Sequence, residues 1–179
     1  MEPNQKLYKI AVLGAESTGK TTLCRQLAEH FHTRWVPEYA REYIEQITRD
    51  YVLKDLEIIA ERHVQNEIET CRIANKYIFV DTEMIILKVW AKEKFQSIPE
   101  FISRHLLKQQ YDLYLVMAND LPWVYDPVRE NPDKRDYLLN LYMQELDEIK
   151  ARQVFISGFG EERFLKAVAE VGKLGGGEI

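Results

Sequence analysis

The sequence predicts a three-layer α/β fold, in which a five-stranded parallel β-sheet lies between helices on both of its faces. Short apolar runs alternate along the chain with longer stretches of helical period. This alternation is typical of β-α units that build a parallel sheet. The chain has 179 residues, which is the length of one domain with a sizeable core. We therefore expect residues 1–179 to form a single domain.

Each predicted element is an apolar run or a segment of helical period, taken in chain order. The predicted strands are residues 8–14, 33–38, 76–81, 111–118 and 152–157. The predicted helices are residues 20–31, 39–48, 54–75, 84–93, 100–108, 134–150 and 161–174. The glycine-rich residues 175–179 are expected to form a flexible tail. The connection 119–136 is long for a compact domain, and such a loop is usually either functional or loose.

A glycine-rich loop joins the first strand to the first helix. Gly14, Gly19, Lys20 and Thr21 match the pattern G-x-x-x-x-G-K-[ST] between a strand and a helix. In such a loop, backbone N–H groups converge on phosphate oxygens at a helix N-terminus, where the helix dipole favours an anion. Lys20 would reach the β- and γ-phosphates of ATP, and the Thr21 hydroxyl would bind Mg²⁺. The predicted ATP-binding residues are Gly14, Ala15, Glu16, Ser17, Thr18, Gly19, Lys20, Thr21 and Thr22.

The alternative for this loop is an ordinary strand-to-helix turn with a solvated Lys20. Average glycine usage gives such a match by chance on the order of once per hundred chains of this length. The strand before the loop and the helix after it lower that frequency further. We therefore predict a loop that binds a nucleoside triphosphate.

Asp81 ends the apolar run YIFVD. A carboxylate at the carboxyl edge of a parallel strand lies at the crevice where α/β sheets bind ligands, within reach of a Mg²⁺ held by Thr21. The alternative is that Asp81, followed by Thr82 and Glu83, caps the next helix. Because the phosphate loop lies upstream, we favour the metal role.

Glu38 follows a short strand directly, and Tyr39 and Arg41 lie in the first turn of the next helix. In phosphate-loop kinases of small molecules, the end of this strand faces the γ-phosphate. We expect Glu38 to orient an acceptor hydroxyl and Arg41 to bind an anionic or polar part of the acceptor. The alternative is an amphipathic helix start, with Glu38 placed favourably on the helix dipole and Arg41 solvated.

The connection 119–136 has the place and composition of a lid over ATP. It contains three prolines together with Trp123, Asp126, Arg129 and Arg135. Closure of a lid would exclude water and bring an arginine onto the transferring phosphoryl group. The alternative is a solvated loop whose arginines pair with neighbouring carboxylates.

Composition argues against several other classes. The net charge is -5 and the pI about 5.5, without the basic stripe that a polymeric nucleic acid needs. Cys24 and Cys71 stand alone, and no His or Cys cluster has metal-ligand spacing, so we expect a reducing compartment and no zinc. The polar N-terminus does not fit a signal peptide, and no apolar run has the length of a membrane span. We expect a cytoplasmic protein without membrane partners; its oligomeric state stays open.

Four segments together resemble a known family. GAESTGKTTL (14–23), VPEYAREYIE (36–45), VDTE (80–83) and NDLPWVYDPVR (119–129) are similar, in order and spacing, to the ribosylnicotinamide kinase domain of the NadR-type regulators of NAD synthesis and to related small kinases. The resemblance covers nearly the whole chain. It implies transfer of the ATP γ-phosphate to the ribose 5′-hydroxyl of nicotinamide riboside, which gives nicotinamide mononucleotide.

The resemblance also implies roles for single residues. Lys20, Glu38, Asp81 and Arg129 are the implied catalytic residues, with Arg129 on the lid. Thr21 and Asp81 serve Mg²⁺. The implied substrate-binding residues are Trp35, Glu38, Tyr39 and Arg41.

The chain departs from the family in two places. Multidomain relatives carry a DNA-binding and an adenylyltransferase domain ahead of the kinase, whereas here the phosphate loop begins at Gly14, so we expect neither activity. Some relatives place an aromatic ring before the E-Y pair to stack on nicotinamide, and this chain has Pro37, with Trp35 two residues earlier. The identity of the base therefore stays open. The alternatives are a kinase of another nucleoside or a nucleotide, and a regulatory module that binds ATP without transferring phosphate.

Overall fold

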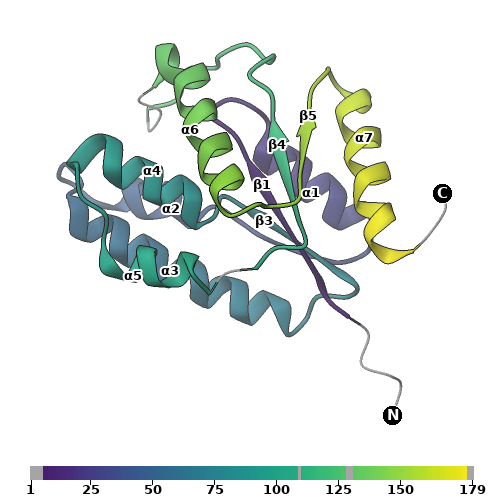
Figure 1. Cartoon of the computed structure of the whole chain (residues 1–179). Helices are drawn as coiled ribbons and strands as arrows, with labels where there is room; N and C mark the ends of the chain where they lie inside the picture. Colours follow the sequence, from purple (N-terminus) through teal and green to yellow (C-terminus); the bar gives the residue numbers. More distant parts are fainter. Residues whose placement is uncertain (1–5, 109, 128–130, 177–179) are drawn as a thin grey trace.

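In the computed structural model, the described residues are 6–108, 110–127 and 131–176. They contain a parallel sheet in the order β2-β3-β1-β4-β5, with helices on both faces (Figure 1). The strands are β1 (Tyr8–Leu13), β2 (Arg34–Val36), β3 (Tyr77–Asp81), β4 (Leu113–Met117) and β5 (Gln153–Ile156). The predicted three-layer fold and its five strands are confirmed.

The helices follow the predicted order closely. They are α1 (Lys20–His30), α2 (Tyr39–Gln46), α3 (Leu53–Cys71), α4 (Met84–Phe95), α5 (Glu100–Leu106), α6 (Arg135–Glu148) and α7 (Glu161–Gly172). Two short 3-10 helices, η1 (Pro132–Lys134) and η2 (Lys173–Gly175), complete the described elements. The predicted third helix is too long, because α3 ends at Cys71. Gly175 belongs to η2, and its carbonyl accepts a hydrogen bond from Lys76 at 3.1 Å; residues 177–179 of the expected tail lie outside the described residues.

The sheet is apolar on both faces, as a buried parallel sheet must be. Along β1, Ile10 and Val12 pack on the side of α1 and α7. Ala11 and Leu13 pack on the other side, with α4 and α6. Because side chains alternate along a strand, each central strand contributes to both core layers. The helices α2, α3, α4 and α5 enclose a further cluster around Leu56.

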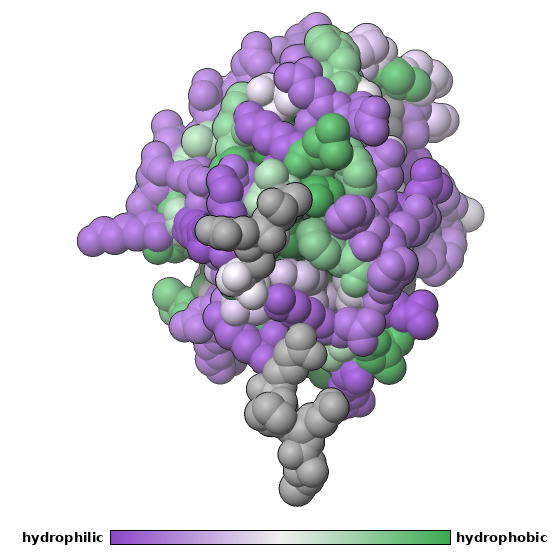
Figure 2. Space-filling view, turned by 90° about the vertical axis from the view of Figure 1, so that its right-hand side faces the viewer, coloured by the Kyte–Doolittle hydropathy of each residue, from purple (hydrophilic) through white to green (hydrophobic). Residues whose placement is uncertain are grey.

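The outer surface is mixed in character. On the face that carries α7, hydrophilic side chains predominate, with smaller apolar areas between them (Figure 2). Exposed apolar side chains of this part of the chain include Phe155, Phe159 and Leu165. Within the described residues, no helix combines the length and the apolar content needed to cross a membrane.

Asp55, a buried carboxylate, joins α2 to α3. It accepts hydrogen bonds from the Tyr43 hydroxyl at 2.7 Å, from the Val52 N–H at 2.7 Å and from both terminal nitrogens of Arg49 at 2.7 and 2.8 Å. The Arg49 guanidinium is the main cause that holds the pKa of Asp55 well below its usual range. Since α2 begins next to Glu38, this carboxylate helps to fix a helix that borders the predicted site.

We expect Asp55→Asn to lower the free energy of unfolding by about 2 kcal/mol at pH 7, because charged hydrogen bonds are lost in a buried place. The pKa of Asp55 is lowered on folding, so its contribution is complete above the ordinary value of 3.8 and is lost as the pH falls below it. Urea denaturation at pH 7 and pH 3 measures both effects. The gap between the two proteins should shrink at pH 3, while Glu57→Gln, in an exposed ion pair with Lys54, should change little. Equal stability at pH 7 would contradict this role of Asp55.

Candidate active site

The phosphate loop lies between the end of β1 and the start of α1, and two of its residues must be glycine. Gly19 has φ 81° and ψ 20°, a left-handed conformation, directly before α1. At Gly14, a Cβ atom would lie 2.8 Å from the Cβ of Met117 and 2.9 Å from Oγ1 of Thr18. The loop therefore passes too close to β4 for a side chain at Gly14, and its backbone is held near the centre of the sheet.

Lys20 lies over its own loop. Its Nζ donates to the Ala15 carbonyl at 3.0 Å, and the Thr18 hydroxyl donates to the same carbonyl at 2.8 Å. The Lys20 side chain therefore points back over the loop toward Ala15. A bound triphosphate would offer the ammonium group stronger, charged acceptors.

Asp81 contacts the phosphate loop directly. The Thr21 hydroxyl donates to Oδ2 of Asp81 at 2.5 Å, although the two residues are far apart in the chain. Asp81 is fully buried, and burial, followed by the nearby charge of Glu38, raises its pKa to about 6. The residue that caps α4 is Glu83 and not Asp81. Glu83 directly precedes α4, and its side chain accepts a hydrogen bond from the Ile85 N–H at 2.9 Å.

Thr21 and Asp81 fit the ligand chemistry of Mg²⁺. This ion prefers oxygen ligands and usually takes one or two carboxylates together with water and phosphate oxygens. Oδ1 of Asp81 is buried and has no hydrogen-bond partner within the described residues. An unpaired buried carboxylate oxygen beside a hydroxyl is a suitable place for a cation, directly or through water.

A cavity of about 480 Å³ opens above the phosphate loop, within the usual range for small-molecule sites. The loop forms one side, and α2, α4 and α6 supply most of the rest. Its lining includes the predicted residues Glu38, Arg41, Gly14, Glu16, Ser17, Thr18, Gly19, Lys20, Thr21 and Thr22. It also includes residues that the sequence analysis missed, namely Ile44, Thr82, Ile86, Trp90, Glu93, Lys94, Leu138 and Tyr142.

Glu38 and Arg41 enter this cavity from the start of α2. Glu38 makes no side-chain cap hydrogen bond to α2, and its charge helps to raise the pKa of Asp81, so the two carboxylates lie close together. Arg41 pairs with Asp126 at 2.8 Å and with Glu45 at 3.4 Å. The structure thus brings Glu38 beside the phosphate loop and ties Arg41 to the predicted lid.

The other two predicted substrate-binding residues lie elsewhere. Trp35 packs against the core on the side of α1 and borders a separate surface hollow with Arg25 and Thr33. Val36, the next residue, faces the opposite side of the sheet, because side chains alternate along β2. Tyr39 packs on Tyr43, with ring centroids 6.1 Å apart, and is not part of the cavity lining. The structure therefore does not bring the side chains of Trp35 and Tyr39 to this cavity.

The segment between β4 and α6 lies over the phosphate loop. Ser17 Oγ donates to the Val124 carbonyl at 3.3 Å and accepts from the Val124 N–H at 3.2 Å. The Asn131 N–H donates to Glu16 Oε2 at 3.1 Å. These contacts hold the described part of the segment against the phosphate loop. Arg129, the predicted lid arginine, lies outside the described residues.

Arg135, the first residue of α6, is the arginine of the predicted lid that the structure describes. It donates to the Leu121 carbonyl at 2.9 Å. Its Nε and Nη2 are buried and have no hydrogen-bond partner in the part of the chain that the structure describes. Arg135 therefore keeps donors available close to the phosphate loop.

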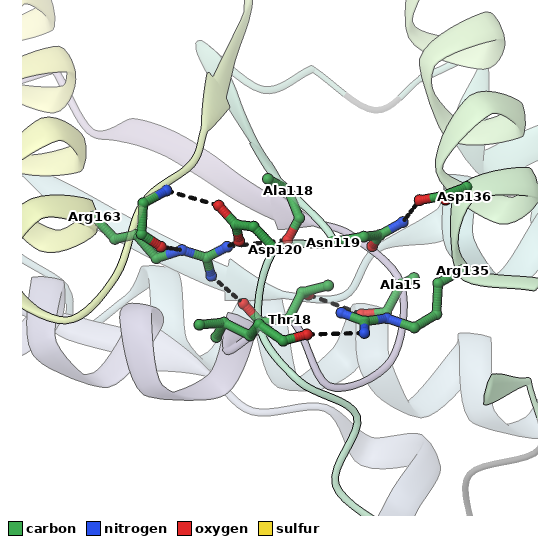
Figure 3. A network of polar contacts seen from close by, with 10 residues as sticks. Ala15, Thr18, Ala118, Asn119, Asp120, Arg135, Asp136 and Arg163 are labelled. Carbon is green, nitrogen blue, oxygen red and sulfur yellow. Dashed lines mark hydrogen bonds and ion pairs between the residues drawn. The ribbon is translucent and has the colours of Figure 1, made fainter. Parts of the chain in front are cut away.

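Arg163 of α7 connects the phosphate loop to the ends of β4 and β5 (Figure 3). It is 5% exposed. Its guanidinium donates to the carbonyls of Thr18 at 2.6 Å, Ala118 at 3.0 Å and Gly158 at 2.7 Å, and it also pairs with Asp120. No sequence pattern pointed to this residue, since an arginine in the first turns of an amphipathic helix is usually solvated.

We expect Arg163→Leu to lower the free energy of unfolding by roughly 2–3 kcal/mol, because three carbonyls and the partly exposed Asp120 would lose their charged partner. Hydrogen exchange of residues 14–19 should quicken more than exchange in the α3 core. Lys166→Met, an exposed change on the same helix, is the control and should leave both unchanged. Unaltered exchange of the loop in Arg163→Leu would show that Arg163 does not hold it.

The chain is similar in sequence to known proteins over most of its length. The chain is 29% identical to the trifunctional NAD biosynthesis/regulator protein NadR of Escherichia coli (strain K12), and the match covers 93% of the chain and 42% of that protein. A similar protein of Salmonella typhimurium gives the same identity and coverage. The chain thus spans less than half the length of these curated relatives.

Among solved structures, a NadR protein in complex with NR superposes with a TM-score of 0.82 at 25% identity, over 96% of this chain and 52% of that chain. Thymidylate kinase from Ehrlichia chaffeensis superposes with a TM-score of 0.61 at 14% identity, over 92% of this chain and 98% of that chain, and so shares the fold. The sequence model described as AAA domain matches residues 9–163. Because that match spans most of the chain, the protein belongs to the AAA domain family.

Proposed function

We propose that this protein is an ATP- and Mg²⁺-dependent nucleoside kinase, and that nicotinamide riboside is its acceptor. The observation that carries the proposal is the shared cavity, in which the phosphate loop and Glu38 line the same space. A donor phosphate and an acceptor hydroxyl need this proximity for in-line transfer. The similarity to NadR proteins, one of them solved with NR, supports the choice of acceptor.

In the proposed reaction, the ribose 5′-oxygen attacks the γ-phosphorus of ATP. The bond between the γ-phosphorus and the bridging oxygen breaks, and ADP leaves. The 5′-hydroxyl proton passes to the Glu38 carboxylate late in transfer and from there to solvent. Lys20 and the loop N–H groups neutralise charge on the β- and γ-phosphates.

Mg²⁺, when bound, would neutralise negative charge on the phosphates. Thr21 and Asp81 would hold it, and their hydrogen bond at 2.5 Å brings both oxygens to one place. The segment with Asp126 and Val124, and Arg129 within it, would exclude water from the transferring group. We assign Arg129 a role on the lid by family resemblance alone.

A panel of nucleosides and nucleotides tests the function. We expect ADP release that depends on the acceptor and is fastest with nicotinamide riboside. A kinase of another nucleoside would show the same dependence with a different best acceptor. A regulatory ATP-binding module would show only slow hydrolysis, whatever small molecule is added.

Two carboxylate substitutions test the assigned roles. Asp81→Asn should raise the Mg²⁺ concentration needed for activity, because a metal ligand becomes neutral. Glu38→Gln should leave ATP and Mg²⁺ binding intact and lower acceptor-dependent turnover roughly a hundredfold. Mg²⁺ titrations at saturating nucleoside measure both.

Glu42→Gln is a matched control. Glu42 is an exposed carboxylate in the first turn of α2, the helix that begins directly after Glu38. It should behave like the wild type. If Glu38→Gln becomes dependent on high Mg²⁺ and Asp81→Asn loses only acceptor turnover, the two roles are reversed.

A further inference from the structure

One face of α4 forms the wall of the cavity away from the phosphate loop. Ile86, Trp90, Glu93 and Lys94 all line the cavity. Their spacing of four, three and one residues places them on one side of a helix. Ile44 of α2 and Leu138 and Tyr142 of α6 add apolar surface to the same cavity. This wall is therefore largely apolar, with the rings of Trp90 and Tyr142 and the carboxylate of Glu93 beside it.

Trp90 is a half-buried ring in a fixed orientation. Its Nε1 donates to the Tyr51 hydroxyl at 2.9 Å, and the two rings meet edge to face with centroids 5.2 Å apart. An indole has a single donor and no acceptor. Because Tyr51 takes that donor, the π-surface is what Trp90 can offer to a ligand.

Glu93 lies one helical turn from Trp90 on the same face. Its Oε1 accepts a hydrogen bond from the Tyr137 hydroxyl of α6 at 3.1 Å, and the residue lines the cavity. The carboxylate is thus held between α4 and α6. It brings negative charge next to an aromatic platform.

Two of the cations that line the cavity contact other groups. Arg41 pairs with Asp126 at 2.8 Å. The Lys94 ammonium lies 3.6 Å from the centre of the Tyr51 ring, where the π-surface attracts it. The other two cations that line the cavity are Lys20 of the phosphate loop and Lys134 of the segment over the loop.

We propose that Trp90 and Glu93 select an acceptor whose base is a positively charged aromatic ring. The inference rests on the proposed kinase function and names the determinant of its specificity. An N-ribosylated pyridinium, as in nicotinamide riboside, carries its charge in the ring. The indole face attracts such a cation, and the Glu93 carboxylate adds a favourable charge. Neutral nucleosides receive only stacking and burial, so they bind less tightly.

Kinetics with a matched pair of acceptors test this. Nicotinamide riboside and its reduced dihydropyridine form share the ribose and the carboxamide but differ in ring charge. We expect the wild type to prefer the cationic form. Glu93→Gln should lower kcat/KM for the cationic form roughly fivefold, with little change for the neutral form. Trp90→Leu should lower kcat/KM roughly tenfold for the cationic form, and less for the neutral form, which loses stacking alone. Glu148→Gln, an exposed carboxylate of α6 outside the cavity lining, should match the wild type.

Tryptophan fluorescence gives a readout independent of turnover. The chain has three tryptophans, and a pyridinium stacked on an indole quenches its emission. Titration with nicotinamide riboside should quench the tryptophan emission of the wild type. It should quench the emission of Trp35→Phe to a similar extent, because Trp35 lies outside the cavity. Trp90→Phe should lose most of the quenching while its melting temperature and ATP binding confirm that it is folded.

The outcomes separate this inference from the proposed function. If the wild type phosphorylates neither form, the proposed nicotinamide riboside kinase function is contradicted, whatever the variants do. A wild type that phosphorylates nicotinamide riboside, with variants that lower turnover of both forms equally, would overturn the inference alone. Undiminished quenching in Trp90→Phe would also overturn it.

Discussion

The register between β1 and β3 governs the position of every group in the candidate site. Val12 of β1 lies opposite Asp81 of β3, so the phosphate loop, which follows β1, begins beside the carboxylate. Val36 of β2 lies opposite Val80, and the chain after β2 therefore brings Glu38 to the same edge. A shift of one residue in a parallel strand would turn each inward side chain to the other face. Such a shift would put side chains of the wrong size into both core layers, because the two faces pack against different helices.

Two buried carboxyl groups at this edge each have one specific partner. Asp81 and Glu83 are both buried completely, and burial raises the pKa of Asp81 to about 6 and that of Glu83 to about 8. Glu83 caps α4, the helix that carries Trp90 and Glu93. Asp81 bonds Thr21 and keeps one oxygen without a partner among the described residues. One carboxylate thus fixes a wall of the cavity, and the neighbouring one is left for a cation.

The sequence was informative where a local pattern determines the structure. The phosphate loop, the five strands and the carboxylate Asp81 each follow from a short segment and its neighbours. The sequence could not predict which side of the sheet Trp35 faces, because this depends on the direction of one side chain in a strand of three residues. The sequence did not point to Trp90, Glu93 or Arg163, because their roles depend on contacts between distant segments. Helix periodicity predicts only whether such a side chain is buried in the core or exposed to solvent.

The central claim is that one cavity brings the ATP γ-phosphate to a nucleoside hydroxyl. Phosphorus NMR of the reaction with ATP, Mg²⁺ and nicotinamide riboside tests it most directly. We expect a new phosphomonoester signal, split by the 5′-methylene protons, that grows in step with ADP. Inorganic phosphate as the sole new phosphate product, at a rate independent of the nucleoside, would contradict it.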